Sequence, residues 1–387
     1  MGVYSEYLDK QMPFEDLSAE RKKQLKRIST LRGRGVLVYA SNINASVPNS
    51  IDYSDVVPFS DQLSNINSDD IDIILETPGG LAEVVEDFVK LIRKHHSHLG
   101  IIVPGTAKSA GTIFTMAADE ILMGELSSVG PIDAQIVSNG KHFSADAFLQ
   151  GLDKIRQETA ASKNLELAYI PMLQHLSPGE IQHCENAQNF SKTLVRNWLK
   201  EYKFSSWTKH SDTGELVTPE DKEKRADDIA TQLGNHSHWL THGRSIKIDD
   251  LRAMGLKITD YSEDEELNDA IVRYYTLLQM TFETNIYKIY ETPESQIYRS
   301  FNQGPPLNNN AARTIPNPLI LDAECPKCKN TIKIQINFER EFPLVSGAQP
   351  YPKNNRLKCP RCGVETELLN LRQQLEAQTG KKIVISD

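Results

Sequence analysis

The feature that most constrains this chain is a series of short, unbroken apolar runs, each followed by a turn and then by a helical pattern. The runs have strand length and do not alternate between apolar and polar residues, which is typical of strands buried on both faces. A repeated strand–helix–strand order predicts a largely parallel sheet covered by helices, the α/β class. The runs are residues 36–40, 71–75, 101–103 and 121–123.

Helical patterns dominate after residue 150. Ser177-Pro178 and Thr218-Pro219 pair a capping residue with a proline at the first helical position, which predicts two helix starts. A third helix is predicted from Glu263 to about Tyr290, with apolar residues at near-heptad spacing. This helix either binds a partner or a second copy of the chain, or packs on its own domain. Residues 300–318 have the Pro, Gly and Asn content of a linker.

Length and composition narrow the class of protein. A chain of 387 residues exceeds one average domain, and the formal net charge of −9 argues against a nucleic-acid partner bound through phosphates. The apolar runs are too short to span a membrane, and the N-terminus lacks the pattern of a signal peptide. Four of the five cysteines form two Cys-x-x-Cys pairs, as in metal sites of reducing compartments. We therefore expect a cytoplasmic protein that does not contact membranes.

Two turns carry residues suited to acyl transfer. Glu76-Thr77-Pro78-Gly79-Gly80 follows one predicted strand, and Ala107-Lys108-Ser109-Ala110-Gly111-Thr112 follows the next. Both turns lead into helices, whose first backbone N–H groups have no partner within the helix. Ser109 supplies a hydroxyl nucleophile, and N–H groups of Gly80 and Ala110 would stabilise an oxyanion. Either turn alone is more often an ordinary strand-to-helix connection; the two together, one strand–helix unit apart, predict an active site.

The segment LETPGG, the helix after it and IIVPGTAKSAGTIFTMAADEILMGELSSVGPIDAQ closely resemble the serine dehydrogenase proteinase family. The resemblance covers residues 70–136 and resumes at residues 240–258. It implies the fold of the Clp protease proteolytic subunit and of signal peptide peptidase A, the Clp/crotonase type. It also implies that Ser109 is the nucleophile and that Gly80 and Ala110 donate the oxyanion hydrogen bonds.

The same resemblance implies a general base. In the Clp subunit a catalytic histidine follows the strand after the serine helix, and here Asp133 takes that place. The Clp subunit has its catalytic aspartate shortly before a Gly-Leu pair, and here His242 stands thirteen residues before Gly255-Leu256. The acid and the histidine would thus be exchanged, with His242 as base and Asp133 orienting it. The alternative is that Asp133 caps a turn and His242 packs under a loop.

Two lysines offer a different base. Signal peptide peptidase A resembles this chain too and uses a Ser/Lys dyad, and Lys154 and Lys163 lie in the corresponding window. Both stand in a charged helical stretch, where a solvated lysine is the commoner outcome. Lys108 adjoins the nucleophile and is expected to point away from it. His236 and His238 lie close to His242 in sequence, but their spacing fits no common zinc pattern.

The C-terminal segment predicts a zinc ribbon. Two Cys-x-x-Cys knuckles, each with a proline inside, are separated by 30 residues that include an alternating β-ribbon pattern. Each knuckle places two thiolates on one tight turn, and two knuckles complete a tetrahedral site for a structural Zn²⁺. In a domain with so small a core the metal would supply much of the folding energy. The predicted ligands are Cys325, Cys328, Cys359 and Cys362.

These observations predict a Clp-fold serine peptidase domain over residues 1–262, a long helix and linker over 263–318, and the ribbon over 319–387. The enzyme would be a serine endopeptidase, a hydrolase that cleaves peptides or unfolded protein segments. No Walker-type ATPase motif occurs. The resemblance implies a homo-oligomer, and a protein partner would bind through the ribbon or residues 263–290. The alternatives are a non-catalytic Clp-fold scaffold and a crotonase-like acyl-CoA enzyme.

Overall fold

The computed structural model describes residues 2–45, 47–138, 140–174, 176–210, 213–301, 317–369, 371–372, 375–376 and 381–385. The chain divides into two compact units, Met1–Asn302 and Gln303–Asp387. Most of the predicted linker, residues 302–316, lies outside the described residues. Each unit is described by itself.

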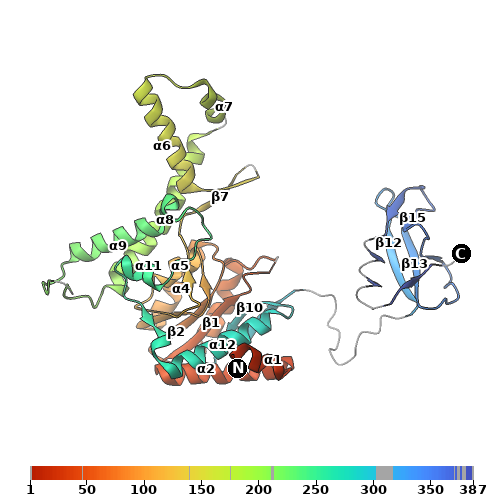
Figure 1. Ribbon diagram of the computed structural model, residues 1–387, viewed down its shortest axis with the longest axis horizontal. Coiled ribbons are helices and arrows are strands. Elements are labelled where there is room, and N and C mark those ends of the chain that lie inside the picture. The colour runs from red at the N-terminus through yellow and green to blue at the C-terminus, as the bar shows by residue number, and fades with distance from the viewer. Residues whose placement is uncertain are drawn as a thin grey trace. The chain divides into compact units, whose positions relative to one another are not determined.

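The first unit is built on a seven-stranded sheet with the order β11-β10-β1-β2-β3-β5-β9. Five neighbouring strands are parallel, and β10 and β11 extend the sheet in antiparallel fashion at one edge. Figure 1 shows these strands at the centre of the unit with helices on both sides. The strands are β1 (Gly35–Ser41), β2 (Asp70–Glu76), β3 (His98–Val103), β5 (Glu120–Met123), β9 (Thr259–Asp260), β10 (Ile286–Glu291) and β11 (Gln296–Ser300).

Both faces of the sheet are buried, which explains why its strands read as unbroken apolar runs. Alternate residues of β1, such as Leu37 and Tyr39, belong to a core shared with helices α4 (Ala82–His95) and α5 (Ala110–Thr115). The residues between them, Val36 and Val38, belong to a second core with α2 (Phe14–Arg32) and α12 (Glu265–Phe282). The predicted α/β class is therefore confirmed for this unit.

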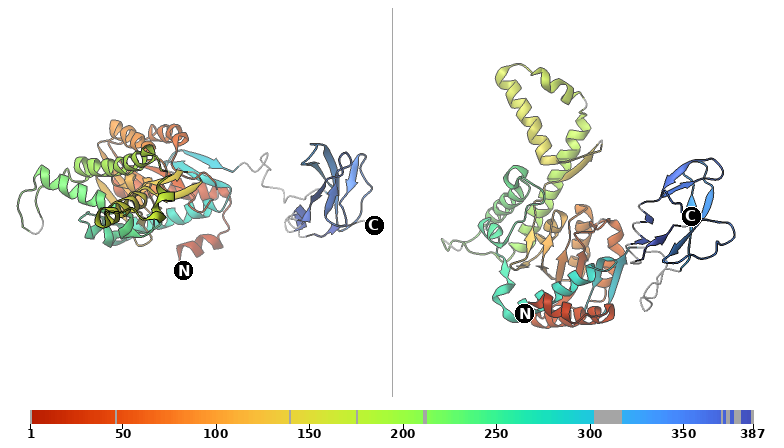
Figure 2. Two further views of the ribbon diagram at one scale, coloured as in Figure 1. Left: turned by 90° about the horizontal axis from the view of Figure 1, so that it is seen from above. Right: turned by 45° about the vertical axis from the view of Figure 1, so that its right-hand side comes forward.

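The remaining elements of the first unit lie around the sheet. The two-stranded β4–β6 ladder is separate from the main sheet, and β7, β8, α6 and α7 form an arm that projects away from it (Figures 1 and 2). They are α1 (Val3–Asp9), α3 (Val56–Leu63), β4 (Thr106–Ala107), β6 (Ser128–Val129), β7 (Gln135–Ser138), β8 (Lys141–Ser144), α6 (Ala145–Ser162), α7 (Ile170–Leu173), α8 (Pro178–Trp198), α9 (Pro219–Leu233), α10 (His236–Trp239) and α11 (Ile248–Ala253).

The long helix predicted from Glu263 to Tyr290 is shorter in the structure. Helix α12 ends at Phe282, and Ile286–Glu291 form strand β10 against β1. The apolar spacing continued past the helix end because Ile286 and Ile289 pack into the same core from a strand. The segment 263–301 thus belongs to the first unit, and the unit boundary lies some forty residues after the predicted end of the peptidase domain at 262.

The second unit is a small β structure around one apolar core. A central strand pairs with three others, and a two-stranded ribbon lies beside them. Among the described residues of the whole chain, no helix has the length and apolar character to cross a membrane. The strands are β12 (Leu319–Glu324), β13 (Thr331–Phe338), β14 (Ala348–Pro350), β15 (Arg356–Lys358), β16 (Glu365–Glu367) and β17 (Ile383–Val384).

Candidate active site

Ser109 occupies a strained turn between β4 and α5. Its backbone angles are φ 50° and ψ −116°, a conformation that residues other than glycine rarely adopt. Strain of this kind costs about 1–3 kcal/mol and persists only where the surroundings enforce it, as at nucleophilic serines on strand-to-helix turns. The side chain is partly exposed, and its hydroxyl caps no helical N–H.

Backbone pairing fixes the Ser109 turn against the glycine turn. Thr77 N–H donates to the Thr106 carbonyl at 2.8 Å, and Lys108 N–H donates to the Thr77 carbonyl at 3.0 Å. A Cβ added to Gly79 would lie 2.7 Å from Ser109 Cβ, closer than real Cβ atoms approach one another. The glycine is thus required because the two turns are in direct contact.

Two backbone N–H groups next to this contact, those of Gly80 and Ala110, have no partner among the hydrogen bonds found in the described residues. Ile51 pairs with Gly80 as in a parallel ladder: Ile51 N–H donates to the Gly79 carbonyl at 2.7 Å, and Leu81 N–H donates to the Ile51 carbonyl at 2.9 Å. In such a ladder the N–H of Gly80 itself faces the opposite side. Ala110 is the first residue of α5, so its N–H has no carbonyl partner within the helix. These are the two predicted oxyanion donors.

A buried ion pair holds the segment that pairs with Gly80. Lys288 Nζ donates to both carboxylate oxygens of Asp55, at 2.9 and 2.8 Å, and to the Ser50 carbonyl at 2.6 Å. Both side chains are fully buried, and the hydroxyls of Tyr39 and Tyr290 also donate to Asp55. The network thereby anchors residues 50–55 to β1 and β10, and Ile51 to the glycine turn.

A second buried carboxyl lies just before the glycine turn. Glu76 Oε2 accepts a hydrogen bond from Thr106 N–H at 2.7 Å, which joins the end of β2 to the start of β4. Tyr275 OH donates to the other oxygen at 3.3 Å. Burial raises the pKa of Glu76 to about 8, and the ion pairs found among the described residues include none with Glu76, so the carboxyl is mostly protonated at neutral pH.

The structure brings Asp133 and His242 together. Asp133 is fully buried, and its Oδ1 lies 2.7 Å from His242 Nδ1. Burial acts to raise the pKa of Asp133, but the hydrogen bond and charge of His242, with help from Ser144 and His236, hold it below its ordinary value. The aspartate is therefore ionised and directs Nε2 of His242 away from itself.

Sequence reasoning missed the second partner of Asp133. His236 Nδ1 lies 2.9 Å from Asp133 Oδ2, so each carboxylate oxygen faces one histidine. His236 stands at the start of α10, where its N–H donates to Asp146 at 2.9 Å. The clustering of three histidines in seven residues is the sequence signal for this contact, although their spacing indicates no role by itself.

One short ladder explains why these side chains meet. Ala107 pairs with Val129 in parallel, and Val129 pairs with Ile246 in antiparallel fashion through two bonds of 3.0 Å. Ser109 and Asp133 follow their ladder residues, whereas His242 precedes Ile246. Because the last pairing is antiparallel, all three side chains lie at the same end of the ladder. The hydrogen bonds found among the described residues do not include one between Ser109 and His242.

The two candidate lysines are not brought to this end of the ladder. Lys154 is 74% exposed on α6, where its partner is Glu158 at 3.9 Å, and Lys163 is the exposed residue that ends α6. A lysine becomes a base through desolvation, which neither site provides. The arm also contains a cavity of about 760 Å³, lined largely by apolar residues of β7, β8, α7 and α8, but none of the candidate catalytic residues lines it.

A comparison with known protein families supports the resemblance described above. Residues 50–175 match the model of the ClpP-like SDH-type serine proteinases. The match is limited to this part of the chain. The resemblance inferred from the glycine and serine turns is thus confirmed, and with it the ClpP-like character of the α/β domain. The matched segment contains Gly80, Ser109, Ala110 and Asp133 and ends before His242.

Two curated relatives come from Methanocaldococcus jannaschii. Uncharacterized protein MJ0137 is 27% identical over 210 residues, which is 54% of this chain and 58% of the relative. Uncharacterized protein MJ1495 is 35% identical over 89 residues, 23% of this chain and 30% of the relative. The alignments thus span less than two thirds of the length of either relative.

Solved structures with similarity include two mutants of the 1510-N membrane-bound stomatin-specific protease, one of them in complex with a substrate peptide. Their TM-scores are 0.27 and 0.25, at 17% and 18% identity, and the matches cover 48% and 47% of this chain and 72% and 66% of theirs. The ClpP protease catalytic domain from Plasmodium falciparum has a TM-score of 0.22 at 14% identity, covering 54% of this chain and 86% of that domain.

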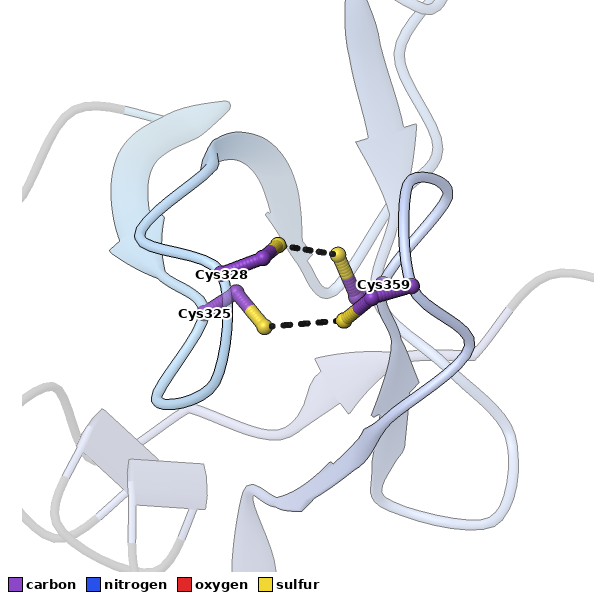
Figure 3. Close-up of side chains that lie close together, drawn as sticks. Cys325, Cys328 and Cys359 are labelled. Carbon is purple, nitrogen blue, oxygen red and sulfur yellow. Dashed lines mark hydrogen bonds between the residues drawn. The ribbon is translucent and has the colours of Figure 1, made fainter.

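The second unit brings four thiols together. Each Cys-x-x-Cys forms a knuckle between two strands: Cys325 N–H donates to the Asn330 carbonyl at 2.9 Å, and Cys359 N–H donates to the Val364 carbonyl at 2.8 Å. Figure 3 shows the sulfurs of the two knuckles facing each other. The Cys325–Cys362 and Cys328–Cys359 sulfur distances are 3.5 and 3.6 Å, and all four ligand atoms lie within 4.8 Å of one another.

These distances fit a metal centre. Four thiolates at about 2.3 Å from a tetrahedral ion lie about 3.8 Å apart, close to the spacing seen here. The backbone N–H groups of Cys328 and Lys327 point at Cys325 Sγ and lower its pKa to about 6, which favours the thiolate. The cluster could therefore hold a metal ion; no other group of three or more ligand side chains at such spacing occurs among the described residues.

The buried ion pair gives a stability prediction. Asp55→Ala should lower the free energy of unfolding of the first unit by about 3–5 kcal/mol, because it leaves the Lys288 ammonium buried without a counter-charge. The exposed Asp61→Ala on α3 is the matched control and should change stability little. Urea unfolding monitored by circular dichroism measures both, and an equally small effect of the two would contradict the anchoring role of Asp55.

Proposed function

We propose that this chain is a serine peptidase that forms an acyl-enzyme at Ser109. The observation that carries the proposal is the strained Ser109 turn held in contact with Gly79-Gly80, with the N–H groups of Gly80 and Ala110 left without partners. A nucleophile beside two convergent N–H donors is the arrangement that acyl transfer requires. The match of residues 50–175 to a serine proteinase family supports the same reaction class.

In this mechanism His242 takes the proton from Ser109 as the hydroxyl attacks a peptide carbonyl. Asp133 holds Nδ1 of the imidazole, which leaves Nε2 as the acceptor and stabilises the imidazolium that forms. The developing oxyanion is stabilised by Gly80 and Ala110. The same imidazole then returns the proton to the leaving amine, and water hydrolyses the ester. The hydrogen bond between Ser109 and His242 would form in the substrate complex, since catalytic hydrogen bonds are often long without substrate.

The substrate would be a peptide or an unfolded segment bound in extended form. One side of the Gly79-Gly80 backbone is already paired with Ile51, and the hydrogen bonds found among the described residues include none from the Gly80 N–H on the other side. A substrate strand added along this open side would place its carbonyl at the nucleophile through backbone hydrogen bonds. We also propose that the chain forms a homo-oligomer, because proteins of the fold that it resembles form rings. The second unit would bind a protein partner.

For the second unit we propose a structural zinc ribbon, with Cys325, Cys328, Cys359 and Cys362 as ligands. Four cysteine ligands leave no open coordination position, so the ion would stabilise the fold and take no part in hydrolysis. The symmetry of the two knuckles and the sulfur spacing support this assignment.

The nucleophile prediction uses a fluorophosphonate probe on the full chain. The probe should label Ser109, and Ser109→Ala should abolish labelling without loss of the fold. His242→Ala should do the same, and Asp133→Asn should slow labelling by up to about 10⁴-fold because the imidazole loses the correct tautomer.

Lys154→Ala and Lys163→Ala are the controls and should label at the wild-type rate. Absence of labelling in the wild type would favour a non-catalytic scaffold, and loss of labelling in a lysine variant alone would favour a Ser/Lys dyad.

The metal prediction is one zinc ion per chain, measured by elemental analysis. Removing it with a chelator should unfold the second unit and leave the first unit folded, because the two units have separate cores. Cys325→Ser should remove zinc, whereas Cys184→Ser, at a buried cysteine of α8, should retain it. A chain that contains no zinc, and whose paired cysteines are alkylated freely in the native state, would contradict the assignment.

A further inference from the structure

Lys108, the residue before Ser109, makes an unusual set of contacts. Its ammonium donates three hydrogen bonds, to the Val129 carbonyl at 2.8 Å, the Arg244 carbonyl at 3.1 Å and the Ser245 hydroxyl at 3.1 Å. Its stem packs on Gly130, where an added Cβ would lie 2.7 Å from Lys108 Cδ. The ion pairs found among the described residues include none with Lys108, so its charge is stabilised by neutral oxygens.

These contacts join Lys108 to two other segments of the candidate site. Val129 precedes Asp133, and Arg244 and Ser245 belong to the loop 241–246 that carries His242. This loop has no regular structure, and most of its residues are exposed. Among the described residues, the other hydrogen bonds that tie the loop to the rest of the unit are the Val129–Ile246 pairing at one end and the bond between His242 and Asp133. Lys108 is therefore the side chain that joins the loop directly to the nucleophile's own turn.

We propose that Lys108 is a positioning residue that clasps the loop 241–246 and so presents the His242 imidazole to Ser109. The inference rests on the proposed function, because it concerns the geometry of the same reaction. Lys108 itself acts on neither substrate nor proton transfer. Its side chain is directed to the oxygens of residues 129, 244 and 245, and Ser109 is held separately by the backbone.

The clasp depends on the charge of the ammonium. Burial, followed by repulsion from Lys247, lowers the pKa of Lys108 to about 8. The segment at Val129 offers Lys108 only a carbonyl, the loop offers a carbonyl and a hydroxyl, and the Lys247 ammonium follows the loop. A neutral amine has two N–H groups for these three acceptors and loses the strength of charge-assisted bonds. The clasp should therefore loosen as the pH rises through this pKa.

The test combines two measurements on the full chain. Hydrogen exchange reports the protection of the loop 241–246 without requiring activity, and fluorophosphonate labelling of Ser109 reports the presentation of His242. In the wild type, both should decline as the pH passes the pKa of Lys108. Lys108→Met keeps the stem but removes the charge, so it should lose loop protection and label up to about 10²-fold more slowly at every pH. Lys108→Arg keeps the charge and should retain labelling without the alkaline decline.

Lys247→Met is the matched control. Lys247 lies on the other side of Ile246 and donates to the carbonyls of residues 125–127. Removing its charge relieves the repulsion, so the alkaline decline should move to higher pH while labelling at neutral pH is retained. Thermal unfolding of each variant separates a folding defect from a positioning defect, and the wild-type and Lys108→Arg profiles decide the matter if Lys108→Met does not fold.

The outcomes separate the two proposals. Lys108→Met with wild-type loop protection, or with lost protection but an unchanged labelling rate, overturns the clasp. An alkaline decline that persists unchanged in Lys108→Arg and Lys247→Met also overturns it. A wild type that is never labelled removes the proposed function, and the exchange measurement still decides whether Lys108 holds the loop.

Discussion

The candidate site depends on one short series of backbone pairings that is separate from the main sheet. Thr77 pairs with Ala107, Ala107 with Val129, and Val129 with Ile246. These four segments are far apart in sequence, yet each carries one part of the proposed chemistry within four residues of its ladder position: Gly80, Ser109, Asp133 and His242. Since a backbone ladder fixes register and direction together, the site is specified mainly by hydrogen bonds that involve no catalytic side chain.

Side-chain hydrogen bonds stabilise these backbone pairings on two sides. Thr112 Oγ1 donates to the Gly130 carbonyl and accepts from the Gly130 N–H, both at 2.9 Å. These bonds join the start of α5 to the loop before Asp133. On the opposite side the Asp55–Lys288 pair holds Ile51 against Gly80. The positive φ of Ser109 can be maintained because its neighbours on both sides are fixed, so the cost of the strained turn is offset by contacts outside it.

The sequence predicted what local pattern encodes. The buried strands, the capped starts of α8 and α9, the two turns and the cysteine knuckles all follow from residues close together in the chain. Asp133 and His242 came from resemblance and not from pattern, since a loop aspartate and a loop histidine have no local signature. The helix end at Phe282 was missed because Ile286 and Ile289 continue the apolar spacing from a strand, and periodicity alone does not reveal where a helix ends.

What the sequence did not provide are the long-range polar partners. His236 on Asp133 joins residues more than a hundred positions apart, and it changes how the acid works. With His236 on Oδ2 and His242 on Oδ1, the carboxylate cannot rotate without breaking one of these two hydrogen bonds. His236 is in turn anchored through its backbone to Asp146 at the start of the arm. The orientation of the proposed base is therefore set by a chain of contacts that runs from His242 through Asp133 and His236 to α6, and the arm and the site are mechanically connected.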